Sequence, residues 1–241
     1  MKNHALEFSP QAYARSAGLL YLIVIVAGVF AEIFVRGGLV VSGDAAATAH
    51  NIMAHELLYR SGFAAELIAC VCNIPLALIF YELFKVVNRR ITLLVVFFSL
   101  VGTAIECAEL LDHFAPLVFL GSGGYLSAIP TGQLQVQAYL SLKLFEMGFA
   151  IALVFFGWFC ILLGWLIFRS GFLPRLIGVL LAIQGVCYLI NSFTDFLAPA
   201  YAPLVFNLLA ISALGEISLC LWMLIRGINV EKWKERAQLV S

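Results

Sequence analysis

The sequence predicts an all-α membrane protein: a bundle of six transmembrane helices with both termini on the cytoplasmic side. Three observations support this fold class. The 241 residues are 63% hydrophobic and only 12% charged, with a mean hydropathy of +1.02, whereas a soluble domain exposes many more charges. Several apolar runs reach the ~20 residues that a helix needs to cross a bilayer. Lysines and arginines gather in alternate connections between these runs, as in multi-pass proteins.

The apolar runs define a single six-helix transmembrane domain. The expected spans are residues 16–35, 57–84, 91–112, 138–168, 176–196 and 203–225, and a short basic tail, 226–241, follows them. The first run continues into Ala31 and Glu32 without a good cleavage pattern, so we interpret it as a retained helix rather than a signal peptide. The fourth span is long enough to tilt or to extend beyond the lipid.

The basic residues set the expected orientation. Those on the cytoplasmic side are Lys2, Arg15, Lys85, Arg89, Arg90, Arg169, Arg175, Arg226, Lys232, Lys234 and Arg236. The opposite connections hold only Arg36, with Arg60 and Lys143 at the starts of the helices that follow. The positive-inside rule therefore places both termini in the cytoplasm. A net charge of zero argues against a nucleic-acid partner, so the expected partner is the lipid bilayer.

The connections differ in character. Asp44 is a plausible N-cap for a short helix over AAATAHNIMAHELL, in the segment 36–56. Residues 113–135 contain Gly121, Gly123, Gly124 and Pro130 and are expected to form an irregular loop. The tail sequence VEKWKERAQLV predicts a short amphipathic helix at the inner membrane surface, with Trp233 as an interfacial anchor.

A weak internal repeat links two spans. The stretches RRITLLVVFFSLVGTAIECAELLDHFAP and PRLIGVLLAIQGVCYLINSFTDFLAP share an arginine near the start, an aspartate (Asp112 or Asp195) and a closing Ala-Pro. Three hairpins of one ancestral kind would explain this pattern, and so would convergence of apolar helices. Both explanations stay open.

Ionisable residues inside the spans are the strongest functional signal, because such groups are costly in lipid and usually face the bundle interior or a water-filled cavity. The candidate cavity residues are Glu66, Glu106, Glu109, Asp112, His113, Glu146, Asn191, Asp195 and Glu216. Most of the acids are expected in the outer half of the membrane. At ~100° per residue, Glu106, Glu109 and His113 fall within about 60° of one another, and Glu109 and His113 can interact directly at i, i+4.

Three ion pairs with helical spacing are expected near helix ends, where a structural salt bridge suffices to explain them. They are Glu32–Arg36, Glu56–Arg60 and Lys143–Glu146. For Glu66, Glu106 and Glu146, which are expected to lie deeper, a structural hydrogen-bond network and a functional cavity both remain open.

A divalent metal is a weaker hypothesis. The side chains of His55, Glu56, Glu109 and His113 are of types that bind zinc or a similar ion, but their spacing matches no known motif, and no other cofactor is implied. Walker A, Gly-x-Ser-x-Gly and GxGxxG motifs are absent. The six cysteines fall in apolar segments and are interpreted as small core residues.

Four stretches resemble the bacterial integral-membrane family called domain of unknown function 4386. They are ARSAGLLYLIVIVAGVFAE, GDAAATAHNIMAHE, RSGFLPRLIGVLLAIQGVCYLI and GEISLCLWMLIRGINVEKWKE. The resemblance runs from about Ala14 to Glu235, and its most specific parts are Leu-Pro-Arg at 173–175 and the Gly-Glu…Leu-Trp…Arg-Gly pattern at 215–227. It implies a multi-pass protein of the bacterial cytoplasmic (inner) membrane. It implies no catalytic residues, because the family carries no established activity.

Three classes of function stay open. The first is a small transporter with an outward-facing acidic intramembrane cavity that binds a small molecule, an ion or a lipid headgroup. The second is a metal-dependent intramembrane enzyme, and the third is a structural or sensory membrane subunit. The sequence does not predict the oligomeric state.

Overall fold

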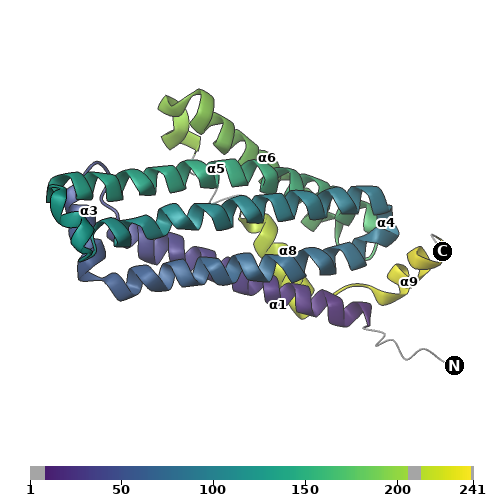
Figure 1. Ribbon diagram of the computed structural model, residues 1–241. Coiled ribbons are helices and arrows are strands. Elements are labelled where there is room, and N and C mark those ends of the chain that lie inside the picture. The colour runs from purple at the N-terminus through teal and green to yellow at the C-terminus, as the bar shows by residue number, and fades with distance from the viewer. Residues whose placement is uncertain (1–8, 206–212, 240–241) are drawn as a thin grey trace. The chain divides into compact units, whose positions relative to one another are not determined.

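The computed structural model describes residues 9–205 and 213–239, and all regular elements within these two ranges are helical (Figure 1). The elements are α1 (Pro10–Val29), the π-helical η1 (Phe30–Arg36), α2 (Gly37–Leu39), α3 (Ala45–Ala54), α4 (Glu56–Phe119), η2 (Gly124–Ala128), α5 (Thr131–Ser170), α6 (Arg175–Leu197), η3 (Pro199–Tyr201), α8 (Leu214–Ile225) and α9 (Val230–Gln238). Among the described residues, four helices are long and apolar enough to cross a membrane: Pro10–Leu39, Glu56–Phe119, Thr131–Ser170 and Arg175–Leu197. The protein is therefore an all-α membrane protein.

The second and third predicted spans both lie within α4. A single residue, Asn88, departs from helical geometry with φ −159° and ψ 105°, and the ribbon reverses direction there (Figure 1). Its side chain caps the second arm, because Asn88 Oδ1 accepts a hydrogen bond from the Ile91 amide at 3.1 Å. The basic connection at 85–90 is thus almost entirely helical.

Two helix ends extend beyond their predicted positions. The third span was expected to end at residue 112, but α4 continues to Phe119 because Leu117 is buried against Tyr59 and Leu142. Helix α5 begins at Thr131, whereas the fourth span was expected from residue 138. The predicted irregular loop 113–135 therefore shrinks to the residues between these helices, where η2 also forms.

The short elements follow the sequence closely. Asp44 Oδ1 accepts a hydrogen bond from the Ala47 amide at 2.8 Å, so the predicted N-cap of α3 is confirmed. The predicted tail helix is α9. Helix α8 covers the described end of the predicted sixth span, and residues 206–212 of that span lie outside the described residues.

The chain divides into two compact units. The first contains Met1–Leu22, Cys72–Gly102 and Leu153–Ser241, and the second contains Ile23–Val71 and Thr103–Ala152. In the first unit, α5 and α6 approach through glycines: a Cβ atom on Gly164 would lie 2.5 Å from the carbonyl oxygen of Gly178. The second unit has an apolar core of Val35, Leu39, Ile52, Tyr59, Leu117 and Leu142, and a smaller one of Cys70, Leu110 and Phe145.

Candidate functional site

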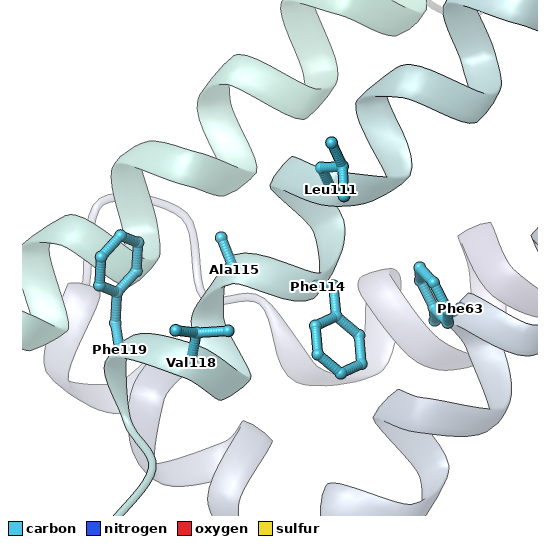
Figure 2. A pocket seen from close by; sticks show the side chains of 6 residues that line it. All are labelled: Phe63, Leu111, Phe114, Ala115, Val118 and Phe119. Atoms are coloured by element: carbon cyan, nitrogen blue, oxygen red, sulfur yellow. The ribbon is translucent and has the colours of Figure 1, made fainter. Parts of the chain in front are cut away.

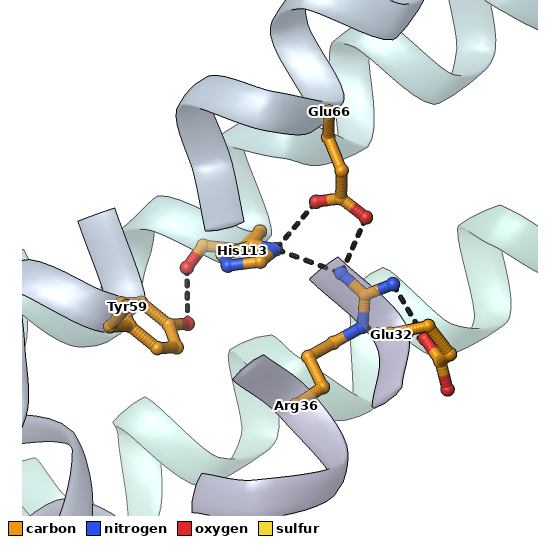
Figure 3. Close-up of polar contacts among 5 residues, drawn as sticks. All are labelled: Glu32, Arg36, Tyr59, Glu66 and His113. Carbon is orange, nitrogen blue, oxygen red and sulfur yellow. Dashed lines mark hydrogen bonds and ion pairs between the residues drawn. The ribbon is translucent and has the colours of Figure 1, made fainter. Parts of the chain in front are cut away.

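Four polar side chains of the second unit, Glu32, Arg36, Glu66 and His113, form a connected cluster, which we call the Arg36 cluster (Figure 3). Glu32 and Arg36 lie on η1. Segments of π-helix are rare and occur frequently at functional sites. Arg36 donates from Nε and Nη2 to Glu32 Oε2, at 2.8 and 2.6 Å, which confirms the predicted helix-end pair.

Arg36 also makes a second, buried ion pair. Its Nη1 atom lies 2.5 Å from Glu66 Oε1, and the two side chains are only 11% and 9% exposed. The guanidinium also lies 4.6 Å from the centre of the Phe145 ring, which gives a cation–π contact. Burial of both partners makes this pair much harder to break than a surface salt bridge.

His113 completes the cluster from the second arm of α4. Its Nδ1 atom lies 2.9 Å from Glu66 Oε2 and 3.2 Å from Arg36 Nη1. A carboxylate only accepts hydrogen bonds and a guanidinium only donates them. Protonated Nδ1 therefore donates to Glu66, whereas unprotonated Nδ1 accepts from Arg36. The presence or absence of a hydrogen on Nδ1 therefore decides which of the two groups the imidazole bonds.

The surroundings of His113 are aromatic. The rings of Tyr59, Phe145 and Phe63 have centres 4.8, 5.3 and 6.3 Å from the imidazole centre, and His113 is fully buried. The Tyr59 hydroxyl donates to the backbone oxygen of His113 at 2.5 Å (Figure 3). The imidazole Nε2 has no hydrogen-bond partner among the described residues.

Glu109 is a second buried acid of this unit. It is 7% exposed, and neither carboxyl oxygen has a hydrogen-bond partner in the described part of the chain. Space for the carboxyl comes from Gly148 on α5, where a Cβ atom would lie 2.5 Å from Glu109 Cδ. The direct interaction expected between Glu109 and His113 does not take the form of a hydrogen bond, and the imidazole Nδ1 faces Glu66 instead.

The other predicted cavity residues have different environments. Glu106 and Asp112 are half-buried on α4, whereas Glu146 is exposed and pairs with Lys143 at 2.7 Å. The remaining three, Asn191, Asp195 and Glu216, belong to the first unit.

Those three residues form local polar contacts within the first unit. Asn191 Nδ2 donates to Asp195 Oδ2 at 3.1 Å. The Tyr188 hydroxyl lies 3.4 Å from Glu216 Oε2, and the Glu216 amide donates to Gln184 Oε1 at 2.8 Å. The candidate cavity residues are thus divided between two compact units.

The weakly predicted metal ligands do not converge. His55 Nδ1 lies 3.1 Å from the Asn51 carbonyl oxygen, and Glu56 pairs with Arg60 at 2.7 Å, as the helical spacing predicts. Across residues 9–205 and 213–239, no group of three or more His, Cys, Asp or Glu side chains is arranged to hold a metal ion.

The second unit also has an apolar groove of about 360 Å³ (Figure 2). We call it the Phe63 groove, and its lining residues are Phe63, Leu111, Phe114, Ala115, Val118 and Phe119. Because the Phe63 ring also contacts His113, one aromatic side chain touches both the groove and the cluster. The Arg60 guanidinium lies 5.6 Å from the centre of the Phe114 ring.

A family model described as Domain of unknown function (DUF4386) matches residues 16–227. The chain belongs to this family. The resemblance predicted from the four sequence stretches is thereby confirmed. No curated protein and no solved structure matches the chain. The description of this family gives no activity.

Sequence reasoning missed the central role of Arg36. It paired Arg36 with Glu32 alone, because only that contact has helical spacing, and it gave Tyr59 and Phe145 no role. The available signal was the position of Arg36, the lone basic residue expected between the outer helix ends. A cation directly after an apolar run is costly unless it finds an acid.

Proposed function

We propose that the chain is a small membrane transporter that binds a proton or small cation at the Arg36 cluster and Glu109. The observation that supports this proposal is an excess of buried carboxyl groups over buried cations. Glu66 and Glu109 are both over nine-tenths buried. Arg36 forms an ion pair with Glu66, whereas the carboxyl oxygens of Glu109 have no hydrogen-bond partner among the described residues. A second carboxylate in apolar surroundings is costly unless it gains a proton or a cation.

His113 suits the handling of such a proton. Its Nδ1 atom faces an acceptor on one side and a donor on the other, so Nδ1 has a partner both with and without its hydrogen. Ionisable groups inside membrane spans are typical of ion pathways and proton relays. A hydrogen on His113 Nδ1 would strengthen the bond between His113 and Glu66 and remove the bond that Nδ1 accepts from Arg36. Binding of a proton would in this way be coupled to the contacts of Arg36.

The Phe63 groove supports a solute with an apolar portion. Ligand sites are commonly apolar clefts with a few polar groups at one side, and the Phe63 ring touches both the groove and the imidazole. The positive-inside rule predicts that the connection containing α3 and the connection containing η2 lie on the outer side of the membrane. The site would then open outward.

Proton flux in proteoliposomes tests this function. Vesicles containing the protein and an internal pH dye should dissipate an imposed pH gradient faster than empty vesicles, and apolar solutes should accelerate the flux. Glu109→Gln should remove the protein-dependent flux, because the amide cannot exchange a proton. The matched control is Glu146→Gln, since Glu146 is an exposed acid of the same unit, and it should keep the flux.

Two results would contradict the proposal. One is a dissipation rate equal to that of empty vesicles. The other is equal flux in Glu109→Gln and wild type. Either result, together with a lower unfolding temperature of Glu109→Gln, would favour a structural role for the cluster.

A further inference from the structure

We propose that the first unit binds an anionic phospholipid in the groove between α6 and α8. This groove has a volume of about 460 Å³, and both helices line it. We call it the Arg226 groove. It is independent of the Arg36 cluster, because all of its lining residues belong to the first unit.

The Arg226 groove changes from charged to apolar along its length. Arg226 lies where α8 ends, and Ile177, Leu180 and Leu221 line the wall beyond it. From Arg226 to Ser218 the helix rises about 12 Å at 1.5 Å per residue. Such a groove accommodates part of an acyl chain, with the lipid headgroup at the guanidinium.

Arg226 is available for an anionic headgroup. Its side chain is exposed, and within the described ranges no carboxylate lies close enough to form a salt bridge with it. Its backbone oxygen accepts a hydrogen bond from Gln11, but this contact does not use the guanidinium. Trp222 lines the same groove and is partly exposed, and tryptophan is enriched where apolar and polar regions of a membrane meet.

The segment after α8 adds positive charge at the same end. The Asn229 amide donates to the Phe172 carbonyl oxygen at 3.0 Å, and Arg236 Nη2 donates to the Arg169 carbonyl oxygen at 2.6 Å. These bonds hold α9 beside the connection that precedes α6. From residue 226 to 239 there are four basic residues against two acidic ones. This balance complements an anionic headgroup.

The membrane supplies such a lipid. The positive-inside rule places this basic end at the cytoplasmic surface, where anionic lipids give a negative potential and each nearby lysine or arginine contributes about 1 kcal/mol of attraction. The chemistry therefore favours a phospholipid with a net negative headgroup over a zwitterionic one.

The test measures lipid binding to the full-length protein in detergent by native mass spectrometry. Phosphatidylglycerol should bind more tightly than phosphatidylcholine with matched chains. Arg226→Gln should weaken phosphatidylglycerol binding about fivefold and leave phosphatidylcholine binding unchanged, whereas Arg226→Lys should retain the preference. Arg60→Gln, which removes an exposed arginine of the second unit, is the control and should bind like wild type.

A groove-filling variant and a headgroup probe separate the lipid from a free anion. Ser218→Trp should weaken binding of both phospholipids, because the indole occupies space needed by the acyl chain. Glycerol phosphate alone should not displace phosphatidylglycerol. The proposal is overturned if Arg226→Gln keeps the lipid preference, if Arg60→Gln loses it equally, or if glycerol phosphate displaces the lipid.

Discussion

Substitution of Gly148 by alanine tests whether the Glu109 carboxyl is held against α5. A Cβ atom at this position would lie 2.5 Å from Glu109 Cδ and 2.6 Å from Oε1, distances that force one side chain to move. Because Glu109 is buried, its carboxyl has little free space. Overpacking of this kind costs about 1–3 kcal/mol, partly offset by about 0.5–1 kcal/mol from replacing glycine within a helix.

The same reasoning predicts that the cost disappears when Glu109 is shortened. In a Glu109→Ala background, Gly148→Ala should be neutral or stabilising, so the double-mutant cycle should give a coupling of about 1–3 kcal/mol. Unfolding in mixed micelles, followed by tryptophan fluorescence, measures all four variants. Gly28→Ala is the matched control, because a Cβ atom at this helical glycine meets nothing within 4 Å. Equal effects of Gly148→Ala in both backgrounds would refute the contact.

Four further substitutions test a buried and an exposed ion-pair partner, a close helix contact and a helix cap in the same unfolding assay. Glu66→Gln should cost about 3 kcal/mol, because it leaves a buried guanidinium without its inner partner, whereas Glu32→Gln, at a side chain 58% exposed, should cost less than about 1 kcal/mol; equal costs would contradict the assigned burial. Gly164→Ala should destabilise by about 1–3 kcal/mol, because the new Cβ atom would meet the Gly178 carbonyl oxygen at 2.5 Å. A neutral effect there would exclude the close approach of α5 and α6. Asp44→Ala should cost about 1 kcal/mol by removing the N-cap, with faster hydrogen exchange confined to α3; unchanged exchange would rule out the cap.

Local features of this chain were predictable from sequence, because they depend on residues a few positions apart. The Asp44 cap and the Arg60–Glu56 pair are of this kind, since helical geometry alone brings the partners together. Composition likewise predicted long apolar helices. The chain reversal at the single residue Asn88 was harder to predict, because the basic residues around it are also typical of an ordinary loop.

The candidate site was predicted only in part. The acids on α4 were identified, but Arg36 and Glu66 are 30 positions apart, so their pairing depends on how three helical segments pack. The orientation of His113 depends on the same packing: Glu109 is its helical neighbour, yet the imidazole faces Glu66. The space that Gly148 leaves for the Glu109 carboxyl cannot be inferred from either helical segment considered alone.

The π-helical turn that carries Arg36 has a consequence for how this region tolerates insertions and deletions. Each π-type hydrogen bond spans one residue more than an α-type bond, so η1 contains a surplus residue relative to a regular helix. Deletion of one residue within Phe30–Arg36 would let the segment relax to an ordinary α-helix without disturbing the helix before it. The residues after the deletion would keep approximately their direction about the helix axis, because a π-helical turn accommodates its extra residue within about one rotation. A single-codon deletion is therefore expected to be tolerated better within this segment than within the regular helices that flank it.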